Sequence, residues 1–120
     1  MNDKIVLAEK FAKFHDIARP RIVAELNGQH VKLVRFRGTF IWHAHPDEDE
    51  MFLVLEGRLR IEFRDREVWL GAGEMLVVPR GVEHRPQADE EVRLMLVEPA
   101  GTRNTGDVRD ARTSDTPEWI

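Results

Sequence analysis

The chain has 120 residues, with 18 basic and 22 acidic side chains, a formal net charge of -4 and no cysteine. This length suits a single domain with one core, and the lack of cysteine excludes disulfides, thiolate metal ligands and thiol nucleophiles. The arginines are scattered rather than clustered, which argues against nucleic-acid binding. No apolar run approaches the roughly 20 residues of a membrane-spanning helix, so we expect a cytoplasmic protein with neither a nucleic-acid nor a membrane partner.

The N-terminal segment is expected to contain a short helix over residues 4 to 17. Apolar side chains there recur at close to helical spacing, and Pro20 ends the pattern. Two β-rich runs follow on either side of Asn27 and Gly28. These two residues tolerate a positive φ and therefore predict a β-hairpin with a two-residue turn.

Short strands are expected to follow one another through the rest of the domain, separated by turns rich in Gly, Pro and Asp. Two of them alternate cleanly: Leu59, Ile61 and Phe63 share one face, and so do the apolar residues 92, 94 and 96. This pattern is typical of a β-sandwich or barrel. The predicted strands span residues 38 to 45, 50 to 55, 58 to 63, 67 to 70, 75 to 79, 83 to 86 and 91 to 98.

The segment from Gly101 onward is polar, turn-rich and aperiodic. It is expected to lie over the domain or to hang free. Trp119 near its end is a weak hint of docking.

The stretch HAHPDEDE holds the candidate site. If residues 38 to 45 form a strand, His43 and His45 point to one face, because side chains two positions apart share a face. The turn that follows returns the chain at Glu50, which then stands beside both histidines, whereas the other carboxylates stay in water. A turn near Pro79 and Gly81 would bring His84 to the same place.

Three imidazoles and one carboxylate form a donor set that suits one divalent transition metal. Fe, Mn, Ni, Co and Zn all fit this donor set, and the sequence does not indicate which of them is bound. A buried glutamate also needs such compensation, since burying an unpaired charge costs several kcal/mol. The alternative is a barrel in which these residues remain as part of the fold but no longer bind a metal.

The segments GTFIWHAHPDEDEMFLVLEG and GEMLVVPRGVEH resemble the two signature motifs of the cupins. His43, His45, Glu50 and Gly57 match the first motif, and Gly73, Pro79, Gly81 and His84 match the second. The resemblance covers roughly residues 30 to 98. It implies an all-β double-stranded β-helix, or jelly-roll barrel, with a short N-terminal helix and a metal held by His43, His45, Glu50 and His84.

The expected organisation is a single cupin domain over residues 1 to 120. Residues 1 to 28 supply the N-terminal helix and strand, residues 29 to 98 the barrel core, and residues 99 to 120 the polar tail. The expected cavity wall is apolar and comprises Ile41, Phe52, Val54, Leu59, Ile61, Val77, Leu94 and Leu96.

The expected strands 38 to 45 and 50 to 55 are apolar on both faces. Phe40, Trp42 and Ala44 lie on the face opposite the candidate site in the first strand, and the apolar residues 51, 53 and 55 do so in the second. Something must cover the outer face. Small cupins commonly dimerise through such a face, so the resemblance favours a homodimer; the alternative cover is residues 4 to 36 of the same chain.

Two functions remain open at this stage. The first is a metal-dependent enzyme, an oxygenase, isomerase or lyase, acting on a small oxygen-rich metabolite at the open positions of the metal. The second is a non-catalytic module that binds or senses a small molecule. No catalytic acid or base can be assigned from the residues, and no organic cofactor is expected.

Overall fold

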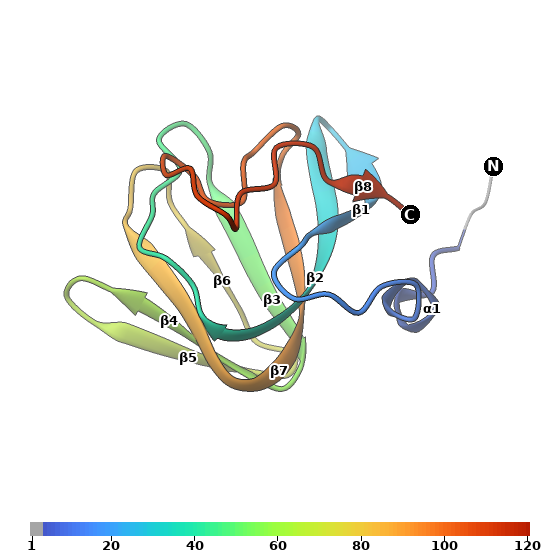
Figure 1. Ribbon diagram of the computed structural model, residues 1–120, viewed down its shortest axis with the longest axis horizontal. Coiled ribbons are helices and arrows are strands. Elements are labelled where there is room, and N and C mark those ends of the chain that lie inside the picture. The colour runs from blue at the N-terminus through green and yellow to red at the C-terminus, as the bar shows by residue number, and fades with distance from the viewer. Residues whose placement is uncertain (1–3) are drawn as a thin grey trace.

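The computed structural model describes residues 4 to 120, and Met1 to Asp3 of the predicted N-terminal segment lie outside the described residues. One short helix and eight strands make up the fold (Figure 1). None of the helical structure in residues 4 to 120 is long and apolar enough to cross a membrane. The elements are α1 Leu7–Phe11, β1 Arg21–Leu26, β2 Gln29–Thr39, β3 Glu50–Glu56, β4 Arg58–Phe63, β5 Glu67–Gly71, β6 Met75–Val78, β7 His84–Pro99 and β8 Glu118–Trp119.

The strands form one strongly bent sheet with the arrangement of a jelly-roll barrel, as predicted. Strand β7 organises it: β2 pairs along most of its length, β4 pairs with its first part, and β3 pairs with its last part. Strands β5 and β6 then extend the two halves. Because β7 belongs to both halves, their inner faces meet and enclose the core.

The core between the two halves is built from the alternation that the sequence shows. Residues of β4 alternate between exposed or half-buried and buried positions, with Leu59 and Ile61 fully buried. The inner cluster gathers apolar side chains from β2 to β7, because each strand turns every second residue inward. Its buried members are Val34, Phe36, Phe52, Val54, Leu59, Ile61, Phe63, Leu70, Val78, Ala88, Val92, Leu94 and Leu96.

The hairpin predicted at Asn27 and Gly28 is confirmed. Leu26 pairs with Gln29, and both turn residues have positive φ, 51° and 77°. This is the backbone that a two-residue turn between twisted strands requires.

The predicted helix over residues 4 to 17 is wrong in length, because only Leu7–Phe11 is α-helical. The guanidinium of buried Arg35 explains the early end. It donates hydrogen bonds to the carbonyl oxygens of Phe11 and Phe14, each at 2.9 Å. These carbonyl oxygens therefore accept their hydrogen bonds from a side chain of β2, and the chain continues as turns toward Pro20.

The predicted strand over residues 38 to 45 is also wrong. Strand β2 continues to Thr39 after a register shift at Gly38, and residues 40 to 49 are mostly irregular. The only paired position in this loop is an isolated bridge between His43 and His84. Phe40 consequently packs edge-to-face on Phe36 and His43 inside the barrel, and not on the opposite face as expected.

The separate strands predicted over 83 to 86 and 91 to 98 are a single bent strand, β7. The segment QADE between them was expected to be a turn. Instead Gln87 and Ala88 pair with Thr39 and Gly38 of β2, so hydrogen bonding to the neighbouring strand continues through the bend.

The C-terminal segment lies over the domain. Figure 1 shows it crossing one end of the sheet and ending as β8, which pairs in parallel with β1. Within this segment, Thr102 and Thr105 are buried. Trp119 is 55 % exposed, whereas Ile120 packs against a second cluster formed with Phe11, Phe14 and Leu33. Docking therefore uses Ile120 more than the tryptophan.

Candidate metal centre

The loop of residues 40 to 49 carries the two histidines of the first motif, and contacts with the β6–β7 turn hold it in place. The backbone groups of His43 and His84 exchange hydrogen bonds of 3.1 and 2.9 Å, and Gly81 N–H donates to the His45 carbonyl at 2.8 Å. Asp49 accepts a 2.8 Å hydrogen bond from Arg80 N–H. Hydrogen bonds from the Arg80 guanidinium, and then this backbone hydrogen bond, lower the pKa of the Asp49 carboxyl. The two motifs are thus joined through their backbones.

Glu50 reaches the site from a regular strand. It is the first residue of β3, where it pairs with Val78, and it alternates inward with Phe52 and Val54. The inward parity of Glu50 was predicted correctly. The expected hairpin pairing with the histidines does not form, so the bending of the sheet brings the carboxylate to them.

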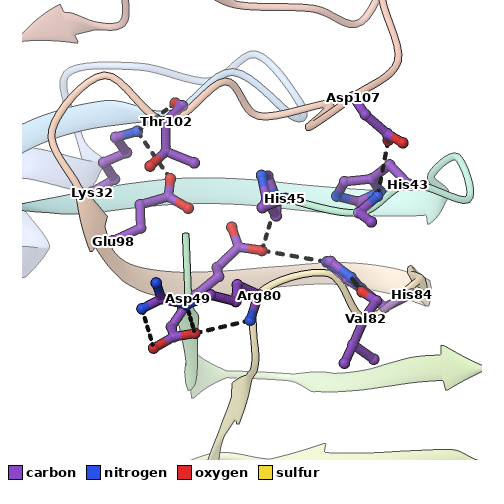
Figure 2. Close-up of polar contacts among 12 residues, drawn as sticks. Lys32, His43, His45, Asp49, Arg80, Val82, His84, Glu98, Thr102 and Asp107 are labelled. Atoms are coloured by element: carbon purple, nitrogen blue, oxygen red, sulfur yellow. Dashed lines mark hydrogen bonds and ion pairs between the residues drawn. The ribbon is translucent and has the colours of Figure 1, made fainter. Parts of the chain in front are cut away.

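All four predicted ligand residues converge. His43, His45, Glu50 and His84 are buried, and each offers one atom within 4.8 Å of the others'. The Nε2 atoms of His45 and His84 lie 3.2 and 3.3 Å from the same carboxylate oxygen, Glu50 Oε1 (Figure 2). Four side chains from a loop and two strands therefore share one centre.

Backbone carbonyls orient two of the imidazoles. His43 Nδ1 lies 2.9 Å from the Ile41 carbonyl oxygen, and His84 Nδ1 lies 3.0 Å from that of Val82. In the neutral ring each Nδ1–H donates to its carbonyl, and Nε2 is then the unprotonated ring nitrogen. This is the tautomer in which Nε2 can bind a metal.

Several buried polar atoms at the centre have no hydrogen-bond partner among the described residues. They are both ring nitrogens of His45, Nε2 of His84 and Oε1 of Glu50. A buried polar group without a partner costs about 1–3 kcal/mol. A divalent cation would satisfy three of these four atoms at once, so the donor set fits a metal.

The protonation states also favour a cation. Burial, followed by the charge of His84, lowers the pKa of His43 to about 4, so this imidazole is neutral at physiological pH. Burial raises the pKa of Glu50, but close contact with His45 and His84 outweighs it and holds the pKa well below the usual glutamate range. Neutral imidazole and ionised carboxylate are the forms that coordinate metals.

Comparison with known proteins agrees with this geometry. The family model described as "Cupin domain" matches residues 30 to 98, more than half of the chain. The chain is a cupin. A crystal structure of a cupin-2 domain protein from Shewanella frigidimarina shares 49 % identity and a TM-score of 0.78, covering 79 % of this chain and 93 % of that one.

Two further relatives extend the comparison. The crystal structure of a Neisseria meningitidis protein superposes with a TM-score of 0.75 at 30 % identity, over 82 % of this cupin and all of that chain. Protein YdbB of Bacillus subtilis is 45 % identical over 67 residues, 55 % of this chain. The match spans 59 % of the length of YdbB.

A buried ion pair beside the centre was missed by the sequence interpretation. Lys32 Nζ donates to Glu98 Oε1 at 2.9 Å and to the Thr102 carbonyl at 3.2 Å, and both charged side chains are at most 1 % exposed (Figure 2). Burial, then the charge of Glu50, raises the pKa of Glu98 well above the usual value. The parity of residues 92, 94 and 96 already indicated that position 98 faces inward.

A cavity of about 50 Å³ opens beside the centre of this cupin and includes His43 and Glu50 in its wall. Phe52, Leu94 and Leu96 line it as predicted. The other predicted wall residues do not line it: Val54, Leu59 and Ile61 are fully buried in the core, Ile41 is half-buried in the loop, and Val77 is 53 % exposed on the outer face. The error at Val77 arises because Val78 is the residue of β6 that turns inward.

The C-terminal segment is hydrogen-bonded to the histidine loop between His43 and His45. Ala44 N–H donates to the Asp107 carboxylate at 3.1 Å, and Asp107 N–H donates to the Ala44 carbonyl at 2.9 Å. Gly106 has a φ of 58°, and a Cβ there would collide with the Ala44 carbonyl oxygen. The close approach of two backbones therefore requires glycine.

Replacement of Gly106 by alanine is expected to loosen the tail from the histidine loop. The substitution adds backbone strain and a steric clash, and we expect a loss of about 2–3 kcal/mol in the free energy of unfolding. Gly101→Ala is the matched control, since Gly101 has a φ of 89° but open space around its Cβ position. Chemical denaturation of both variants measures the difference, and equal losses would contradict the tight contact.

Proposed function

We propose that this cupin is a metal-dependent enzyme that holds one divalent transition-metal ion through His43, His45, Glu50 and His84 and acts on a small oxygen-bearing metabolite. The supporting observation is the convergence of four buried donors within 4.8 Å, several of them without a hydrogen-bond partner among the described residues. Three nitrogens and one oxygen suit Fe, Mn, Ni, Co or Zn.

The residues around the centre have defined roles in this proposal. When bound, the ion supplies Lewis acidity, which polarises a substrate oxygen or lowers the pKa of a water. The Ile41 and Val82 carbonyls hold the rings of His43 and His84 in the binding tautomer. The apolar wall excludes water, which strengthens charge interactions at the site.

The second candidate is a cupin that binds or senses a small molecule without turnover. The observation that favours it is the cavity beside the centre: among the described residues, the only titratable groups in its wall are the proposed ligands His43 and Glu50. No separate acid or base is therefore positioned in the wall to move a proton.

Metal analysis combined with activity screening tests the proposal. The protein is purified without added metal, its metal content is measured, and it is then loaded with Fe(II), Mn(II) or Zn(II). We expect about one ion per chain and metal-dependent conversion of a small oxygen-bearing compound, with oxygen uptake identifying an oxygenase. Tight ligand binding without turnover under any of these metals would favour the binding module, and failure to bind metal would overturn the proposed enzyme.

We further propose that the chain forms a homodimer through the outer face of β3 and β6. Met51 pairs with Val77 and Leu53 with Met75 across these strands, and Met75 and Val77 are 51 % and 53 % exposed. Part of the face expected to be open is covered by the chain itself: Ala44 lies under the tail and Leu55 packs in the cluster of Phe11. The remaining apolar patch is what a second copy would cover.

The variant Val77→Glu is expected to shift the protein from dimer to monomer. A carboxylate at the centre of an apolar interface must be desolvated without a partner, which costs several kcal/mol. Light scattering coupled to size exclusion measures the mass, and Leu26→Glu, at an equally exposed position on the β1–β2 hairpin, is the control. A wild-type chain that is monomeric at high concentration would refute the dimer.

A further inference from the structure

The cavity beside the four ligands is polar at one end only. Nine of its twelve lining residues are apolar, and the polar ones are His43, Glu50 and Asn104. The amide of Asn104 is engaged within the tail, where it donates to the Arg112 carbonyl at 2.8 Å and accepts from Ser114 N–H at 2.6 Å. The hydrogen-bonding capacity of the wall therefore lies at His43 and Glu50.

The rest of the wall offers no partner for a polyhydroxylated or multiply charged molecule. Val34, Phe36, Phe40 and Leu94 line it, and the lining residues include no lysine or arginine. A hydroxyl buried against such a surface without a hydrogen bond costs about 1–3 kcal/mol. Binding of a sugar-like molecule would be weakened by this amount at each buried hydroxyl. Binding of an apolar body is instead strengthened by about 0.8 kcal/mol of free energy per buried CH₂.

Part of the cavity wall comes from segments outside residues 30 to 98. Ala18 and Pro20 precede β1, and Asn104 belongs to the C-terminal segment. Ala18 has a φ of 62°, unusual for a residue with a Cβ, and its N–H donates to the Arg35 carbonyl at 2.8 Å. The backbone of this non-glycine residue is therefore held in a strained conformation at the cavity wall.

We propose that this cavity accepts a small amphipathic molecule, with an apolar body against Val34, Phe36 and Leu94 and a single oxygen-bearing head at His43 and Glu50, and that Ala18 sets the size limit of the body. The proposal deepens the proposed function and rests on it for the role of the head group. It narrows the small oxygen-rich metabolite expected from the sequence to a molecule with one oxygen-bearing head and an apolar body.

Ligand titration of the full-length, metal-free chain tests the class of guest. The probes are 3-methylbutan-1-ol and glycerol, two neutral alcohols with equal numbers of non-hydrogen atoms, and the readout is the methyl NMR signals of Val34, Leu94 and Leu96. We expect saturable shifts with 3-methylbutan-1-ol and none with glycerol. Equal responses to both alcohols, or no saturable response to the first, would overturn the inference.

A second measurement distinguishes failure of this inference from failure of the proposed metal-dependent function. Zinc binding to the same preparation is measured by calorimetry, without any organic ligand. A chain that binds zinc but shows no preference for the apolar alcohol keeps the proposed metal site and loses the inference. A chain that shows the preference but binds no metal keeps the apolar cavity and loses the proposed function.

The variant Ala18→Gly tests the size limit. Glycine adopts the positive φ without strain, so the fold is kept, and loss of the methyl group enlarges the cavity. Affinity for the bulkier cyclohexylmethanol is expected to rise about fourfold relative to that for 3-methylbutan-1-ol, as the burial of one more CH₂ implies. Ala72→Gly, in the exposed β5–β6 turn, should leave the ratio unchanged, and an unchanged ratio in Ala18→Gly would refute the role of Ala18.

Discussion

The variant His45→Ala is expected to reduce bound metal from about one ion per chain to a small fraction, with affinity lowered at least about 100-fold. His45 supplies one of four donors, its Nε2 lies 3.2 Å from Glu50 Oε1, and neither ring nitrogen makes a hydrogen bond to the described residues 4 to 120. The loss therefore removes a coordinate bond that the buried surroundings have no other group to replace.

The same substitution should leave the metal-free barrel folded. His45 is not part of the inner apolar cluster, and the imidazole contributes no hydrogen bond to the folded chain. The truncation leaves a small cavity but also removes two unpaired buried nitrogens, and these effects oppose each other. Circular dichroism should show an unchanged strand signal.

Metal content by mass spectrometry, after dialysis against a chelator of known affinity, measures the effect. The matched control is His30→Ala, which also deletes an imidazole but lies near the surface, where His30 contacts Glu25 at 2.9 Å. Full metal occupancy in His45→Ala, equal to that of the control, would contradict the assignment of His45 as a ligand.

The variant Lys32→Met is expected to destabilise the fold by about 3–5 kcal/mol at neutral pH. Methionine fills a similar volume but leaves Glu98 without its cation, beside a second buried carboxylate. Both partners of the 2.9 Å ion pair are at most 1 % exposed, so solvent does not replace the lost charge. A loss of this size in a chain of this length corresponds to a fall in Tm of roughly 10–20 °C.

The penalty in Lys32→Met should grow with pH. Burial and the charge of Glu50 raise the pKa of Glu98 above its value in the unfolded chain, and removal of Lys32 takes away a cation that lowers this pKa. A carboxyl group with a raised pKa binds a proton more readily when the chain is folded. Its contribution to stability is present at low pH and is lost as the pH rises through the folded-state pKa. The difference in Tm between variant and wild type should therefore shrink toward pH 5.

Thermal unfolding between pH 5 and pH 8 measures both effects. Lys13→Met, which removes an exposed lysine, is the control for loss of a positive charge. The double variant Lys32→Met with Glu98→Leu should recover most of the lost stability, because apolar residues often replace a complete buried ion pair without loss. A single variant that melts within about 2 °C of wild type would show that the pair is not needed as a counter-charge.

Local patterns predicted the elements whose cause is local. Positive φ at Asn27 and Gly28 requires only a two-residue turn, and the alternation around Leu59 and Ile61 requires only one buried face. The spacing of the two motifs likewise indicated four ligand residues whose donor atoms the structure places together. These patterns depend on residues close together in the sequence, so they can be recognised without knowledge of the fold.

The errors occur where a distant group decides the backbone. The helix stops at Phe11 because a guanidinium from β2 takes its carbonyls, and the histidine loop leaves the sheet because it is held by His84, Gly81 and Asp107. None of these partners lies within ten residues of the position it changes. Pattern reasoning over a short window has no access to such contacts.

The amino-acid sequence by itself determined the class of fold, the donors of the candidate metal centre and the inward parity of Glu50, because strand periodicity and residue chemistry are local properties. Only the tertiary structure decided how those donors meet, which residues line the cavity, and that Lys32 and Glu98 form a buried pair beside it. The physical reason is that β7 bends and pairs with three other strands. Residues far apart along the chain thereby meet in one buried interior, where each charged side chain needs an oppositely charged or hydrogen-bonding partner.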